Sequence, residues 1–416
     1  MAKKKDTGVN VADFFAAQLS QRAAENGRDD VYMGDEGDRI IIGLPLTAFS
    51  LQYIFGNTVF PYTRMTELIG RSGSCKTALL FEMYRWHIFN TTEVVPFYPE
   101  EAHGGYVHNL VELRDSPGLR DSILQLNTKT NYPVIITKEV EDWEKSCTDW
   151  IKHAESTFDE GMMPYPVALG VDSLTAGTTR KEAEDTWKDG YASPNFSQIA
   201  RSINLWTKVY FSKMAPWPVS FIGINHVKES KDNRGYTERR VPGGEAIKYA
   251  ATFLLRLNKI SDVERLDESG RNIEIFSEKN SLSSAGQQRS IKVQMKWRYD
   301  DNGKQTTVWD WHDASVELLA SFEATRKKRI ADVVQIENLD KTHRTADCRT
   351  LGLKKTSWHE IGHAIMQEPE IVAGLGKLFG IKKRREFELG VPYREQVDKA
   401  KAEASDEVTE DGEVIS

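Results

Sequence analysis

Residues 68–81 read LIGRSGSCKTALLF, a turn of small residues set between an apolar run and a helical pattern. The apolar run TELIG at 66–70 predicts a buried strand, and TALLFEMYRWHIF at 77–89 has the apolar spacing of a helix. A strand, a glycine-containing turn and a helix in this order aim backbone N–H groups and a helix N-terminus at one point. The segment therefore predicts a phosphate-binding loop.

The loop departs from the usual pattern of Gly, four residues and Gly-Lys-Ser/Thr, because Cys75 stands where the second glycine belongs. A side chain there must point away from the phosphates, and Gly73 is expected to give the turn compensating freedom. Lys76 is expected to neutralise the β- and γ-phosphates, and the Thr77 hydroxyl to ligate Mg²⁺. The predicted nucleotide contacts comprise the whole loop: Gly70, Arg71, Ser72, Gly73, Ser74, Cys75, Lys76 and Thr77.

Further apolar runs predict buried strands at 94–99, 132–138, 165–172 and 218–225. Because helix-length segments separate them, the expected class is α/β, with a parallel sheet and helices on both faces. In RSIKVQMKW, at 289–297, apolar and polar residues alternate, which predicts a half-exposed strand.

Carboxylates follow two of these strands. Asp172-Ser173 ends an apolar run, and a carboxylate at this edge, beside a phosphate loop, would hold Mg²⁺ through water. Glu100 and Glu101 follow the run 94–99, and one of them could orient an attacking water. A solvated loop carboxylate is the alternative for either glutamate.

The segment 221–260 is the most specific, because Asn225-His226 ends a strand, a basic loop follows, and Gly243-Gly244 opens a new helix. With the loop and strand motifs, it resembles the RecA-type recombinases. It is most similar to their phage UvsX-type branch, in which Asn-His likewise ends the strand and the glycine before the loop lysine is also replaced. The resemblance covers roughly residues 40–300.

This resemblance implies a RecA-like P-loop NTPase core with a mostly parallel central sheet. It also implies ATP and Mg²⁺ as cofactors, a helical filament on single-stranded DNA, and strand exchange with homologous duplex DNA. Glu101 looks like the catalytic glutamate, His226 like the γ-phosphate sensor, and Lys279 like the basic residue that reaches a neighbouring protomer's ATP. Tyr106 is similar to the adenine-stacking tyrosine, although its spacing from Glu101 differs.

Two basic segments are candidates for DNA binding, since cations around an aromatic residue suit phosphates and a stacked base. Without the family resemblance, a solvated loop of mixed charge would be the better interpretation of the second segment, at 228–240, and the charge of the first, at 178–197, is balanced. The expected contacts are Arg180, Lys181 and Lys188 in the first segment, and Lys228, Lys231, Arg234, Tyr236, Arg239, Arg240, Gly243 and Gly244 in the second.

The chain is expected to divide into a helical arm with its linker (1–38), an ATPase core (39–312), a small helical C-terminal domain (313–400) and an acidic disordered tail (401–416). The arm is a candidate for oligomerisation. No apolar run approaches the roughly 20 residues of a membrane span. The three scattered cysteines favour a reducing compartment, and the resemblance suggests the cytoplasm of a phage's bacterial host. Single-strand-binding or mediator proteins would be further partners.

Two other functions fit parts of the sequence. A ring-forming helicase or DNA motor would share the nucleotide site. His359-Glu360-x-x-His363 matches the zinc metallopeptidase pattern, in which two histidines one helical turn apart bind Zn²⁺ and the glutamate acts as base. Against the second function, Ser357 and Glu360 have the spacing of a capping box, which explains the glutamate as the start of a helix.

Overall fold

The computed structural model describes residues 41–89, 91–92, 106–111, 134–136, 141, 144–145, 147–149, 152, 166–174, 179–189, 196–214, 217–231, 237–240, 245–264, 269–299, 305–325 and 330–413. The chain divides into two units, residues 42–394 and residues 1–41 with 395–416. The predicted arm and linker (1–38), Glu101, Arg234, Tyr236, Gly243 and Gly244 lie outside the described residues.

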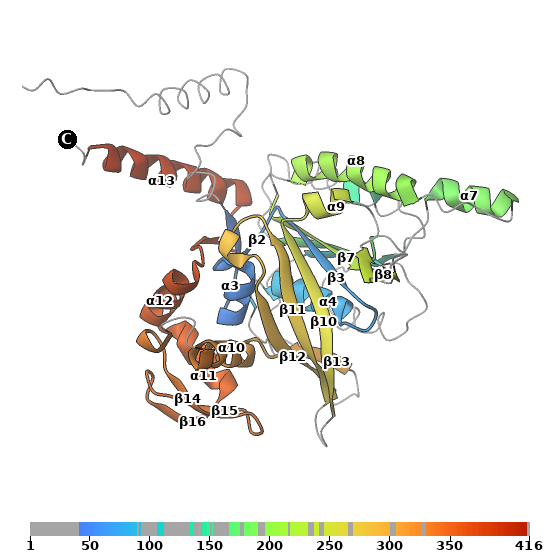
Figure 1. Ribbon diagram of the computed structural model, residues 1–416. Helices are drawn as coiled ribbons and strands as arrows, with labels where there is room; N and C mark the ends of the chain where they lie inside the picture. Colours follow the sequence, from blue (N-terminus) through green and yellow to red (C-terminus); the bar gives the residue numbers. More distant parts are fainter. Residues whose placement is uncertain are drawn as a thin grey trace, which may run out of the picture. The chain divides into compact units, whose positions relative to one another are not determined.

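The larger unit is built on one mixed sheet with the strand order β13-β12-β11-β10-β3-β7-β6-β4-β5 (Figure 1). One half is parallel: β3 (Met65–Gly70), β4 (Tyr106–Val111), β5 (Val134–Ile136), β6 (Val167–Asp172) and β7 (Val219–His226). The other half is an antiparallel meander, joined to β3 through a parallel pair with β10: β10 (Phe253–Glu264), β11 (Ser269–Asn280), β12 (Ser290–Tyr299) and β13 (Gln305–Trp309).

The prediction of a RecA-like core with a mostly parallel central sheet is wrong, because the sheet is mixed and its three longest strands, β10, β11 and β12, form an antiparallel ladder. Only four residues separate β10 from β11, which is too few for the crossover that a parallel pair requires. The alternation in β12 is confirmed, since Ile291, Val293 and Met295 are buried between more exposed neighbours.

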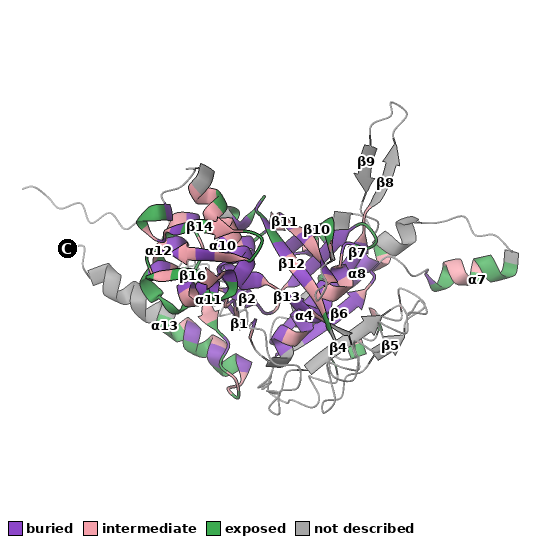
Figure 2. Ribbon diagram, turned by 90° about the horizontal axis from the view of Figure 1, so that it is seen from below, coloured by how far each residue is buried: buried purple, intermediate pink, exposed green. Residues whose placement is uncertain are grey.

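Helices cover both faces of the parallel half. On one face, α4 (Lys76–Phe89) packs so closely on β6 that a Cβ at Gly170 would lie 1.5 Å from the Tyr84 hydroxyl. On the other face, Leu169 and Val171 pack against α8 (Phe196–Met214) and α9 (Glu245–Ala250). Figure 2 shows buried residues along α4 and β6 and exposed residues along α7 (Arg180–Asp189).

The predicted C-terminal domain is not purely helical. It contains a three-stranded sheet of β14 (Ile336–Asp340), β15 (Thr345–Cys348) and β16 (Leu353–Ser357) beside α10 (Trp311–Thr325), α11 (Trp358–Gln367) and α12 (Pro369–Phe379). Phe49, from α3 (Phe49–Phe55), belongs to the same apolar cluster, so a segment far away in sequence completes its core. Two short 3₁₀ turns span Ser284–Gly286 and Ile330–Asp332.

Two further small sheets complete the larger unit: β17-β1-β2, from β1 (Ile42–Pro45), β2 (Val59–Pro61) and β17 (Arg385–Glu386), and the hairpin of β8 (Lys228–Lys231) with β9 (Thr237–Arg240). The last helix, α13 (Tyr393–Glu413), reaches into the segment predicted as a disordered tail, which is therefore helical as far as Glu413. The alanines at 400, 402 and 404 favour this helix through their high helix propensity. Within the described ranges, no helix has both the length and the apolar character that crossing a membrane requires.

Candidate nucleotide site

The predicted phosphate-binding loop joins β3 to α4, at the edge of the sheet where the parallel strands end. A side chain at Gly70 would bring a Cβ within 2.5 Å of the Leu257 carbonyl oxygen and 2.6 Å of Ser74 Oγ, so glycine is required there. Gly73 has a φ of +77° and open space around it, as the compensating role predicts. The tip of the loop, residues 71–73, is exposed.

Cys75 adopts the left-handed conformation that the usual glycine supplies, with a φ of +64°. For a residue with a Cβ this backbone costs about 1–2 kcal/mol. The turn therefore keeps the backbone conformation of a glycine although residue 75 is a cysteine. Contacts from neighbouring residues must offset the conformational energy that this requires.

Lys76 is buried and turns back onto its own loop. Its Nζ donates to the carbonyl oxygens of Gly70 at 3.0 Å and Arg71 at 2.9 Å. Burial lowers the pKa of Lys76, and the carboxylate of Asp172 opposes that shift. Both acceptors are neutral, so a phosphate would be a stronger partner for this ammonium group.

Asp172 ends β6 beside the loop, and the Thr77 hydroxyl donates to its Oδ2 at 2.6 Å. Burial raises the pKa of Asp172, while the hydrogen bond from Thr77 and the positive charges of His226 and Lys76 act in the opposite direction. The peptide bond between Asp172 and Ser173 is cis. A hydroxyl and a carboxylate in contact are the pair that a Mg²⁺ ion bound to nucleotide phosphates uses.

His226 ends β7, directly opposite Gly70 in the register of β3 and β7. The structure thus brings Lys76, Thr77, Asp172 and His226 together, although three separate segments of the chain carry them. This convergence follows from the parallel strands, whose carboxyl ends meet at one edge of the sheet.

Two buried hydroxyl groups at this site lack hydrogen-bond partners among the described residues. They are Ser74 Oγ and Ser173 Oγ, and both are shielded from solvent. Buried hydroxyl groups nearly always have partners, so two without one, on the loop and just after Asp172, suit a ligand rich in acceptor oxygens. The residues present therefore fit a nucleotide phosphate with Mg²⁺.

Tyr106 does not join the group. It stands at the start of β4, paired with Val167, whereas Val111 at the other end of β4 pairs with Asp172. Five residues at about 3.3 Å each separate Tyr106 from the site edge by roughly 16 Å along the strand. Lys279 lies on β11, where its Nζ donates to the carbonyl oxygens of Lys248 at 2.7 Å and Tyr249 at 2.8 Å and so caps the C-terminal end of α9.

Sequence reasoning missed Glu67, a buried glutamate in the middle of β3. The Asn225 side chain donates to its Oε1 at 3.1 Å, and the Asn225 Oδ1 accepts the backbone N–H of His226 at 2.9 Å. Burial raises the pKa of Glu67 to about 7, against the hydrogen bond from Asn225 and the charges of Lys248 and Lys279. A glutamate inside the apolar run TELIG was the available signal, because such a residue is rarely buried without partners.

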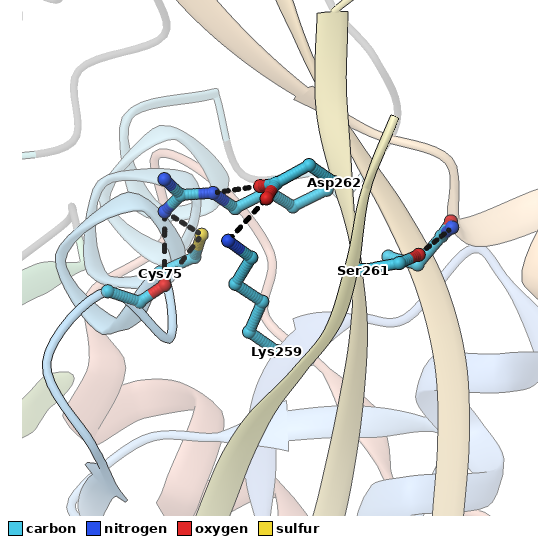
Figure 3. Close-up of polar contacts among 7 residues, drawn as sticks. Cys75, Lys259, Ser261 and Asp262 are labelled. Carbon is cyan, nitrogen blue, oxygen red and sulfur yellow. Dashed lines mark hydrogen bonds and ion pairs between the residues drawn. The ribbon is translucent and has the colours of Figure 1, made fainter. Parts of the chain in front are cut away.

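Sequence reasoning also missed Arg271, on β11. Its Nη1 donates to the Gly73 carbonyl oxygen at 3.0 Å and lies 3.5 Å from Cys75 Sγ. Its Nε donates to Asp262 at 3.2 Å, and Lys259 contacts the same carboxylate at 2.6 Å. In Figure 3, Lys259 and Asp262 lie on the same side of β10 as Cys75, and Ser261 points to the other side. No local pattern predicts this contact, since it joins residues 196 positions apart.

The candidate DNA-binding residues that the structure describes lie on the helix α7 and on the strands β8 and β9. Arg180, Lys181 and Lys188 are exposed on α7, so the expected first DNA-binding loop is partly helical. The helix begins with a capping box, in which Thr179 and Glu182 exchange hydrogen bonds of 3.2 and 3.0 Å. The same helix carries Trp187, which is 91% exposed and was not singled out from the sequence.

The second basic segment forms the β8–β9 hairpin. Its register places Lys228 opposite Arg240 and Glu229 opposite Arg239, while Lys231 pairs with Thr237. Both strands are rich in basic residues, with Lys228 and Lys231 on β8 and Arg239 and Arg240 on β9.

The zinc-type pattern lies on α11. Glu360 completes a capping box with Ser357, which confirms the prediction that it begins a helix. The His312 ring lies 5.1 Å from that of His359 and 5.5 Å from that of His363, so a third histidine packs beside the pair. Among the side chains that the structure describes, however, no group of three or more His, Cys, Asp and Glu residues is arranged to hold a metal ion.

Comparisons with known proteins assign no family to this site: neither a protein-family model nor a curated protein sequence matches the chain.

Proposed function

We propose that this chain is an ATP-dependent DNA recombinase, which hydrolyses ATP at the loop 70–77 and pairs homologous DNA while assembled as a helical filament on a single strand. The observation that carries the proposal is the contact of Thr77 with Asp172 at 2.6 Å, beside the buried Lys76. A lysine, a hydroxyl and a carboxylate are the groups with which P-loop enzymes bind nucleotide phosphates and their Mg²⁺.

The residues have separate tasks in this proposal. Lys76 leaves the Gly70 and Arg71 carbonyl oxygens and neutralises the β- and γ-phosphates. Thr77 and Asp172 would hold Mg²⁺, which offsets the negative charge that develops on the phosphate oxygens. His226, at the end of β7, connects the state of the γ-phosphate to the hairpin that begins two residues later. Glu101 is proposed to orient the attacking water.

The DNA-binding part of the proposal rests on exposed cations at α7 and on the basic hairpin β8–β9. Lysine and arginine side chains bind the phosphate backbone without reading sequence, which suits a protein that must act on any strand. Homologous duplex DNA is the second partner, and single-strand-binding or mediator proteins are expected to assist. In this proposal the reaction takes place in the cytoplasm, which is the host bacterial cytoplasm where a phage encodes the chain.

The deciding experiment measures ATP hydrolysis by the full chain with and without single-stranded DNA, beside the Lys76→Ala variant. Stimulation by DNA that the variant abolishes supports the proposal, and strand exchange between homologous substrates then tests recombination directly. Hydrolysis that DNA leaves unchanged would instead favour the ring-forming motor, and rings rather than helical filaments in the electron microscope would establish it. If the wild-type chain neither binds nor hydrolyses ATP, the nucleotide proposal is wrong.

A further inference from the structure

The loop contains a residue in a conformation that its side chain disfavours, and its surroundings must stabilise that conformation. Cys75 has a φ of +64°, and Gly73, two residues earlier, has a φ of +77°. Within the loop, the Cys75 thiol lies 3.9 Å from the Gly73 carbonyl oxygen, which is too long for a strong contact. The stabilising group must therefore come from outside the loop.

Arg271 is that group. One guanidinium nitrogen, Nη1, reaches both the Gly73 carbonyl oxygen at 3.0 Å and Cys75 Sγ at 3.5 Å. It thereby ties together the two left-handed residues of the turn. A guanidinium group suits this task because its N–H donors have a fixed planar arrangement.

Arg271 is itself fixed by its neighbours in the antiparallel half of the sheet. Asp262, its Cα partner on β10, accepts from Nε at 3.2 Å, and Lys259 lies 2.6 Å from the same carboxylate. The guanidinium carbon lies 5.2 Å from the centre of the Trp297 ring on β12. With its direction set by an ion pair and an aromatic face, Arg271 can restrain the loop at little entropic cost.

We propose that Arg271 is a positioning residue of the nucleotide site, which holds Cys75 in the conformation that a glycine would otherwise supply. This inference rests on the proposed function for its effect on ATP, but its effect on the loop itself does not depend on nucleotide. It explains how a loop without the second glycine keeps a shape that binds phosphate. It also makes Arg271 and Cys75 an energetically coupled pair.

The test is a double-mutant cycle of Arg271→Ala and Cys75→Gly, with the dissociation constant of a fluorescent ATP analogue as the readout. Arg271→Ala should weaken binding about tenfold in the Cys75 protein, because a charged hydrogen bond that positions the site is lost. In the Cys75→Gly background the same change should weaken binding less than about twofold, since glycine needs no restraint. The matched control is Arg298→Ala, an exposed arginine on β12, which should change neither value.

Hydrogen exchange of the peptide covering residues 68–79, without nucleotide, gives the second readout. Arg271→Ala should speed exchange of the loop amides several-fold, and Arg298→Ala should not. Equal weakening by Arg271→Ala in both backgrounds would overturn the proposal, because Arg271 would then act on the nucleotide or the fold directly. Unchanged exchange would also overturn it, whereas absent ATP binding with faster exchange would refute only the proposed function.

Discussion

The two halves of the central sheet contribute to the candidate site in different ways. The parallel half, with β3, β6 and β7, carries the groups that would act on phosphate: Lys76, Thr77, Asp172 and His226. The antiparallel half, β10 to β13, places none of the groups named for phosphate chemistry at that edge, but it supplies Arg271, which restrains the loop, and Lys279, which caps α9. Parallel strands gather their carboxyl ends at one edge, whereas a meander offers long side chains across its surface. The parallel half thus carries the groups expected to contact phosphate, and the antiparallel half carries a residue that positions the loop.

Asp172→Asn tests the chemical half most strongly. The change keeps the shape but removes the negative charge expected to hold Mg²⁺, so ATP turnover should fall by about 10²–10³-fold and need more Mg²⁺. Steady-state hydrolysis across a Mg²⁺ series measures this. Asp332→Asn, at an exposed turn, is the control and should retain full activity. Retention of activity by Asp172→Asn would mean that this edge does not carry the chemistry.

Glu67→Gln tests whether a buried carboxyl group in the parallel half makes the free energy of unfolding depend on pH. The pKa of Glu67 rises from 4.5 to about 7 in the fold, so between these values the folded state holds a proton that the unfolded state releases. Glu67 should therefore lower stability by up to about 3 kcal/mol as pH rises through this window, and Glu67→Gln should remove that part of the slope. Urea unfolding at pH 5 and pH 8 gives both values.

Glu274→Gln, on β11 in the antiparallel half, is the control for the loss of one carboxyl group. It should leave the difference between the two pH values in place. If Glu67→Gln showed the same pH dependence as the wild type, the buried carboxyl group would not be protonated in the fold.

Trp187→Ala extends the comparison to α7, the helix that follows β6. An aromatic side chain that is 91% exposed beside lysines can stack on a base, and its loss should weaken single-stranded DNA binding by about 1–2 kcal/mol, close to tenfold. Fluorescence anisotropy with a labelled oligonucleotide measures the affinity. Leu205→Ala, which removes an exposed apolar side chain from α8, should have no comparable effect. Equal affinities of the wild type and Trp187→Ala would show that Trp187 does not contact the DNA.

Lys279→Met should have the smallest effect. Removing the cation that caps α9 should lower the free energy of unfolding by about 0.5–1 kcal/mol. Chemical denaturation and ATP turnover are measured on the same variant. If ATP turnover fell many-fold while the free energy of unfolding changed little, Lys279 would act on the nucleotide of a neighbouring chain, as the family resemblance implies. The antiparallel half would then also contribute a group that contacts phosphate.

The sequence predicted the parts of the site that lie within single segments. The strand at 66–70, the helix after it and the strands ending at Asp172 and His226 were identified because apolar runs and glycine turns are local signals. The mixed sheet was not, because one strand's pattern does not reveal the direction of its partner. The roles of Glu67 and Arg271 were not predicted for a related reason. They depend on contacts with Asn225 and Cys75, which only the pairing of distant strands brings close.

The pairing of β1 with β17 has a consequence for how the chain folds. Ile42 lies beside Arg385, and Thr58 and Lys382 are hydrogen-bonded, so the first strands depend on residues more than 300 positions later. At a synthesis rate of about 5–20 residues per second, β1 waits roughly 17–70 s for its partner strand. During that interval the edge of β1 that faces away from β2 is unpaired. Completion of this small sheet is therefore a late step of folding during translation, because residues 382–386 must leave the ribosome before β1 can pair with β17.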